Sequence, residues 1–81
     1  MSEKWIKSID GTLYNLSFIS SFYWTTNMSA TSEYRFELHA GGPDMKDIVC
    51  KCSNESDKIM VSSTLEKFIQ SDDKMLVFPK L

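Results

Sequence analysis

Two cysteines and a histidine are the side chains of this 81-residue chain best suited to catalysis or metal binding. Cys50 and Cys52 form a Cys-x-Cys pair, and His39 precedes them. Structural zinc needs four ligands, usually from two close pairs, and the chain has no second pair. A cysteine nucleophile that used His39 as its base would also need a third group to orient the imidazole. We therefore expect both cysteines to be reduced core side chains and His39 to lie on the surface.

The acidic and glycine-rich segments carry no stronger signal. Asp44 and Asp47 flank a predicted loop, and Asp72-Asp73 follow a predicted helix. A calcium loop needs alternating oxygen ligands that end in a glutamate, which neither segment has. Gly41-Gly42 lacks the lysine and the strand–helix context of a phosphate-binding loop. We expect no enzymatic activity, no metal and no cofactor.

The opening segment predicts a β-hairpin. Residues 4–9 read as a strand that ends at Asp10-Gly11, and residues 12–16 read as the returning strand. Asp-Gly between two such runs favours a type I′ turn, which needs positive φ at both central positions. A bend is expected at residues 15–17.

Three further strands are predicted. Residues 19–26 carry aromatic rings on both faces, with Phe22 and Trp24 on one face and Tyr23 on the other. Residues 33–40 alternate cleanly, which predicts Tyr34, Phe36, Leu38 and Ala40 inward and Glu33, Arg35, Glu37 and His39 outward. A turn is expected over residues 41–46. The third strand covers residues 47–52, with Ile48, Cys50 and Cys52 on one face and Val49 and Lys51 on the other.

The C-terminal third changes to a helical period. Val61, Leu65 and Phe68, flanked by Ile59 and Ile69, form a stripe that predicts one helix over residues 54–70. Ser53 or Asn54 would be its N-cap. An alternative makes residues 58–62 a strand and starts a short helix at Ser63, because Ser63-x-x-Glu66 is itself a capping box. Residues 74–79 would then pack back on the sheet as a strand or extended tail.

These elements predict one α+β domain over residues 1–81: a four- to five-stranded antiparallel β-meander packed on one C-terminal α-helix. Trp5-Ile6, Asp10-Gly11 and Asn15-Leu16 also resemble the opening of many short uncharacterised bacterial and phage proteins. That resemblance covers about the first quarter of the chain. It implies a β-meander followed by a helix, and it carries over no functional residue.

Charge and hydropathy exclude several classes of partner. Nine Lys and Arg against eleven Asp and Glu give a net charge of −2, without a basic cluster. Nucleic-acid binding depends on such clusters to displace counterions, so we expect no nucleic-acid partner. No apolar run approaches the length of a membrane span or a secretory signal, so we expect no membrane partner and a cytoplasmic location.

The remaining signal is the aromatic content, which is 12% of the residues. One helix covers only one face of a sheet. Some aromatic rings are therefore expected on the uncovered face of the sheet, at a sheet edge, or beneath a bound partner. We expect protein binding through Tyr23, Trp24, Tyr34 and Arg35. The sequence therefore favours a small non-enzymatic protein that binds a protein partner. We also expect it to form a homodimer. A more specific hypothesis is an inhibitor of a host or defence protein, encoded by a phage or other mobile element. The alternatives are a bacterial accessory domain that acts as a homodimer, and a cysteine- or metal-dependent enzyme.

Overall fold

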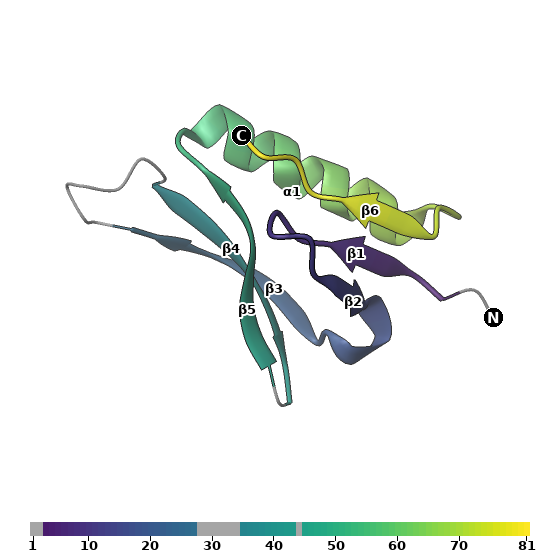
Figure 1. The fold of residues 1–81 in the computed structure, drawn as a ribbon. Coiled ribbons are helices and arrows are strands. Elements are labelled where there is room, and N and C mark those ends of the chain that lie inside the picture. Colours follow the sequence, from purple (N-terminus) through teal and green to yellow (C-terminus); the bar gives the residue numbers. More distant parts are fainter. Residues whose placement is uncertain (1–2, 28–34, 44) are drawn as a thin grey trace.

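The computed structural model describes residues 3–27, 35–43 and 45–81 (Figure 1). Its α+β class and its C-terminal helix confirm the prediction. The elements in chain order are β1 (Trp5–Lys7), β2 (Leu13–Asn15), η1 (Leu16–Phe18), β3 (Ser21–Thr26), β4 (Phe36–Gly42), β5 (Met45–Cys52), α1 (Glu55–Gln70) and β6 (Met75–Val77). No helix in these ranges is long and apolar enough to cross a membrane.

The strands form two sheets of three instead of one continuous meander. β3, β4 and β5 make the meander sheet, in which both pairings are antiparallel. β2, β1 and β6 make the mixed sheet, in which β1 pairs antiparallel with β2 and parallel with β6. The sequence-based prediction of one meander missed this division because the parallel partner of β1 lies at the other end of the chain.

The first hairpin has a three-residue connection and not the predicted type I′ turn. The N–H of Gly11 bonds to the Ser8 carbonyl, and the N–H of Ser8 bonds to the Thr12 carbonyl. Gly11 has φ 90°, while no described residue other than glycine has positive φ. A turn followed by one left-handed residue is the usual form of such three-residue hairpin loops. Asp10 therefore keeps an ordinary backbone, and its carboxylate accepts a bond from the Thr12 N–H.

The alternation predicted for residues 33–40 is confirmed from Phe36 to Ala40, while Glu33 and Tyr34 lie outside the described residues. The alternation predicted for residues 47–52 is wrong at Ile48 and Val49. Phe36, Leu38 and Ala40 are buried. In β5, Leu38 pairs with Cys50 but His39 pairs with Ile48, so Val49 lies in a β-bulge. The bulge inserts Val49 as an extra residue of β5 between the pairs Leu38–Cys50 and His39–Ile48. As a result, the side chains of Val49 and Cys50 are both buried in the core. Ile48 lies on the outer face with His39. The predicted turn is also shorter, since β4 continues to Gly42 and β5 begins at Met45.

The single-helix prediction is confirmed, so residues 58–62 are helical. Asn54 caps the helix by accepting a 2.8 Å bond from the N–H of Asp57. Val61, Leu65 and Phe68 form its buried stripe. At the other end, Lys4 Nζ donates to the carbonyls of Phe68 and Asp73, at 2.8 and 2.9 Å.

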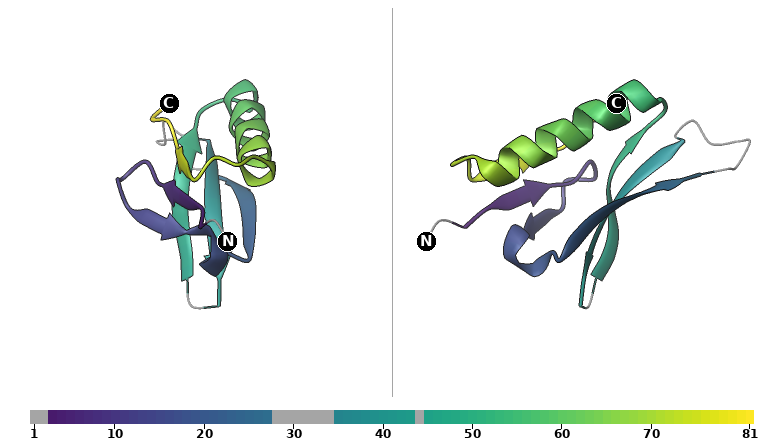
Figure 2. Two further views of the ribbon diagram at one scale, coloured as in Figure 1. Left: turned by 90° about the vertical axis from the view of Figure 1, so that its right-hand side faces the viewer. Right: turned by 180° about the vertical axis from the view of Figure 1, so that it is seen from behind.

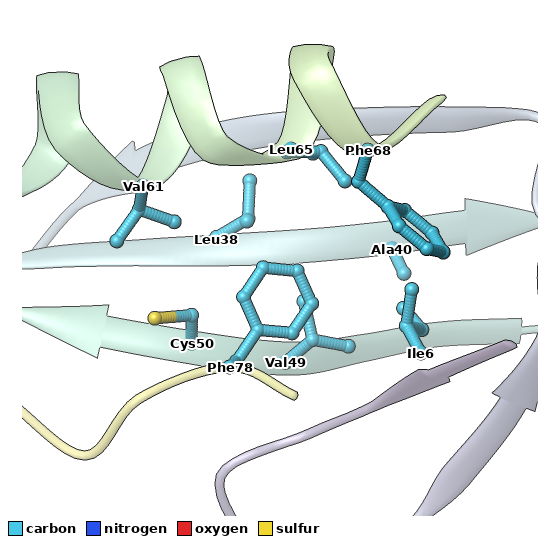
Figure 3. Packing of buried hydrophobic residues seen from close by; sticks show 9 residues of the cluster. All are labelled: Ile6, Leu38, Ala40, Val49, Cys50, Val61, Leu65, Phe68 and Phe78. Atoms are coloured by element: carbon cyan, nitrogen blue, oxygen red, sulfur yellow. The ribbon is translucent and has the colours of Figure 1, made fainter. Parts of the chain in front are cut away.

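The hydrophobic core lies between the inner face of the meander sheet, the helix and the mixed sheet (Figure 3). Its buried members are Ile6, Leu38, Ala40, Val49, Cys50, Val61, Leu65, Phe68 and Phe78. Figure 2 shows α1 on the β3 side of the meander sheet and the mixed sheet on the β5 side. The helix and the mixed sheet therefore share one face of the meander sheet.

The β5 edge of the meander sheet is held by the mixed-sheet side of the molecule. The N–H of Ile9, just beyond β1, bonds to the carbonyl of Val49 at 3.1 Å. Tyr14 of β2 donates its hydroxyl to the carboxylate of Asp47 at 3.2 Å. The carbonyl of the bulge residue Val49 therefore binds the segment that follows β1, and this hydrogen bond links the two sheets. The opposite edge, β3, has no such neighbour among the described residues.

Candidate interaction surface

The open edge of the meander sheet is the strand β3. In the described part of the chain β3 pairs on one side only, with β4. Its six residues, Ser-Phe-Tyr-Trp-Thr-Thr, contain no charged residue and no proline. Charges and prolines are the usual means of preventing an edge strand from pairing with another chain. The six residues of β3 include neither.

The register shows which backbone groups face outward. Asn27 donates its N–H to the Arg35 carbonyl at 2.6 Å, so these two residues form a hydrogen-bonded pair. Opposite residues in an antiparallel ladder alternate between bonded and non-bonded pairs. The backbone groups of Tyr23 and Thr25 therefore point to β4. Those that point away, to the open edge, belong to Phe22, Trp24 and Thr26.

The other edges differ from β3 in length or charge. β2 and β6 have three residues each. β5 has eight residues, but it carries Lys46, Asp47 and Lys51, and Val49 accepts the Ile9 bond. Among the described strands, β3 is the one edge strand that is both longer than three residues and free of charged residues.

The helix places a second feature beside this edge. Trp24 Nε1–H donates to Ser62 Oγ at 2.9 Å, so the Ser62 side of α1 lies next to β3. Ile59, Ser62, Glu66 and Ile69 follow a three–four–three spacing, which puts them on one side of a helix. We call these four residues the α1 rim. Ile59 is 67% exposed and Ile69 46%, so the rim presents apolar surface at both ends.

The outer face of the meander sheet carries a ring stack. The Tyr23 and His39 rings lie parallel, with centroids 5.0 Å apart and 5° between their planes. Thr25 Oγ1 lies 2.8 Å from His39 Nε2. His39 is half-buried, and its Nδ1 is shielded from solvent without a hydrogen-bond partner among the described residues. His39 lies on the outer face, as predicted, but it is only partly exposed because its cross-strand neighbour Tyr23 covers it.

The three predicted binding residues that the structure describes point in different directions. Tyr23 and Trp24 are adjacent in β3 but point to opposite faces, Tyr23 to the outer face and Trp24 to the core and the helix. Arg35 is exposed just before β4, where its carbonyl bonds to Asn27 at the end of the β3 edge. Tyr34 lies outside the described residues. Tyr23 and Trp24 share the strand β3, and Arg35 pairs with Asn27, the residue that follows β3.

The cysteines are buried and unlinked. Burial raises the pKa of the Cys50 thiol to about 11, and burial also raises the pKa of the Cys52 thiol. A protonated thiol is a poor nucleophile and a poor metal ligand. Within the described ranges, no three His, Cys, Asp or Glu side chains lie close enough together to hold a metal ion.

Two other surface features lie on the mixed sheet. Leu13, Met75 and Val77 are exposed on its outer face, where Lys7 separates Leu13 from Val77. A shallow hollow of about 480 Å³ opens where β1 and β6 diverge. Its lining includes Lys7, Lys80 and Asp10, and the Asp10 carboxylate is already bonded to Ser8 and Thr12.

Searches against protein-family models, curated proteins and solved structures found no match to this chain. The description of the site therefore depends on its geometry. Sequence reasoning missed the α1 rim, since it placed Ile59 and Ile69 at the flanks of the core stripe. Their spacing with Ser62 and Glu66 was visible in the sequence, but the position of β3 beside them was not.

Proposed function

We propose that this protein is a non-enzymatic interaction protein that binds another polypeptide through its β3 edge. The observation that carries the proposal is the open, six-residue, uncharged edge strand. An extended segment of a partner would add to the meander sheet and bond to the outward backbone groups of Phe22, Trp24 and Thr26. Main-chain bonds supply affinity in this mode of recognition, and the alternating side chains supply specificity.

Side chains on both faces of β3 can contribute to that specificity. Phe22 and Trp24 pack against the core on the helix side, so their rings are held in place before a partner arrives. On the outer face Tyr23 is held by its stack on His39. Rings that are ordered in advance lose little conformational entropy on binding, which favours affinity. Arg35 is exposed and pairs with Asn27 just beyond the end of β3, so its long side chain would contact the end of the bound segment.

Site-specific photo-crosslinking tests this function. A photoreactive phenylalanine analogue would replace Thr26 or Ser21, which are exposed on β3, and Lys46, which is exposed on the β5 edge, as the control. The proposal predicts an adduct with a polypeptide, either a second copy or a different protein, from the β3 positions and none from position 46. Absence of adducts from both β3 positions, or equal adducts from β3 and β5, would overturn it.

A further inference from the structure

We propose that the polypeptide bound at the β3 edge is a second copy of this chain. The two β3 strands would pair antiparallel about a twofold axis at Trp24, and the two α1 rims would face one another on the same side of the joined sheet. This inference rests on the proposed function, because it uses the same edge. It adds the identity of the partner and the register of pairing.

The β3 sequence is self-complementary about Trp24. The three residues with outward backbone groups are Phe22, Trp24 and Thr26. In the twofold register Trp24 lies opposite Trp24 of the second copy, and Phe22 lies opposite its Thr26. On the outer face Tyr23 lies opposite Thr25. Aromatic–aromatic and aromatic–β-branched pairs are favourable across antiparallel strands, and no charges are opposed.

The α1 rim is self-complementary under the same symmetry. Two rims that run antiparallel bring Ile59 opposite Ile69 of the second copy and Ser62 opposite its Glu66. The apolar ends then cover one another, and the two glutamates face serines instead of each other. Ser62, which accepts the Trp24 bond, lies two residues before Thr64, the midpoint of the rim, so the central part of the rim lies beside Trp24.

A second copy would cover two exposed features at once: the open backbone of β3 and the apolar side chains of the α1 rim. The open strand leaves backbone groups unpaired, and Ile59 and Ile69 remain exposed on the side of the helix beside that strand. A lone extended peptide would pair the strand but leave the rim uncovered. A copy of the chain brings a strand and a rim together, already fixed to each other by the Trp24–Ser62 contact. The net charge of −2 per chain opposes association only weakly.

Sedimentation equilibrium on a set of matched variants tests the pairing. Thr26→Pro removes an outward N–H that has no role in the β3–β4 ladder, so it blocks edge pairing and spares the fold. Ile59→Lys with Ile69→Lys places charges at both ends of the rim. The control Met60→Lys changes an exposed apolar residue elsewhere on the same helix, and Val77→Lys does the same on the mixed sheet. Circular dichroism confirms that each variant is folded.

The native chain is expected to be a dimer at micromolar concentration. Thr26→Pro and the double lysine variant should each weaken dimerisation about tenfold or more, while both controls leave it unchanged. A native chain that stays monomeric at high micromolar concentration would overturn the second-copy proposal. A dimer that only Val77→Lys disrupts would overturn it as well, and would place the interface on the mixed sheet. If the chain is monomeric but crosslinks to a different protein from position 26, the proposed function stands and this inference fails.

Discussion

Trp24 donates its indole N–H to the hydroxyl of Ser62 at 2.9 Å. This bond joins the edge strand to the middle of the helix. It holds the open backbone of β3 and the exposed isoleucines of the α1 rim next to each other. The proposed binding surface therefore combines two segments that are far apart in sequence, and this contact helps to hold them together.

Removing that bond should cost about 1 kcal/mol of unfolding free energy, the usual net value of a neutral hydrogen bond. Trp24→Phe removes the donor and keeps an aromatic ring, and Ser62→Ala removes the acceptor. Because the two changes break the same bond, the double variant should cost less than the sum of the single variants. Urea denaturation of the three variants measures this. Full additivity would show that the contact contributes nothing in solution.

Phe36 and Tyr23 should respond differently to truncation. Phe36 is buried, so Phe36→Ala should lower the unfolding free energy by about 3–5 kcal/mol, enough to threaten a small domain. Tyr23 is half-buried on the open outer face, so Tyr23→Ala should cost roughly 1 kcal/mol or less, yet weaken binding at the β3 edge. Thermal melts and crosslinking yields separate the two effects. Equal destabilisation by both changes would assign Tyr23 to the core.

Lys4 should contribute more stability than an ordinary surface lysine. Its ammonium group donates to the carbonyls of Phe68, Ser71 and Asp73 and lies 4.7 Å from the centre of the Phe68 ring. Lys4→Met should cost about 2 kcal/mol, because it leaves carbonyls at the end of the helix without this donor. Lys67→Met, on the exposed face of the last helical turn, is the matched control and should cost less than about 0.5 kcal/mol. Equal urea midpoints for the two variants would contradict this role.

The buried thiols should make stability fall at alkaline pH. The pKa of Cys50 is raised by burial to about 11 from its ordinary value of 9.0, so the unfolded chain loses this proton first. The stabilisation that comes from keeping the Cys50 thiol protonated in the folded state is complete below pH 9. It is lost as the pH rises from 9 to 11. Urea midpoints across this range should fall less steeply for Cys50→Ala than for the native chain. Identical slopes would contradict burial of the thiol.

Local sequence signals were enough to predict most of the secondary structure. The alternation of Phe36, Leu38 and Ala40 identified the central strand and its buried face. Val61, Leu65 and Phe68 identified the helix, and its start was predicted at Ser53 or Asn54, of which Asn54 is the N-cap. Each of these signals depends on residues close together in the chain, where period and capping chemistry suffice.

What the sequence could not give depended on contacts between distant segments. The bulge at Val49 changes which side chains of β5 enter the core, and it accompanies a bond from Ile9 that no local pattern reveals. The parallel pairing of β6 with β1 joins the two ends of the chain. For the candidate site, Tyr23 and Trp24 were predicted as binding residues, but the rim that includes Ile59 and Ile69 required knowing where the helix lies on the sheet.

Amide hydrogen exchange, followed residue by residue by NMR, tests the pairing of β3 most directly. The amides of Tyr23 and Thr25 bond to β4 and should be protected both in the native chain and in the Ile59→Lys, Ile69→Lys variant. The amides of Phe22, Trp24 and Thr26 point to the open edge. They should be protected in the native dimer, and they should exchange rapidly in the variant and on dilution of the native chain. Rapid exchange of these three amides in the native chain at every concentration would contradict the account.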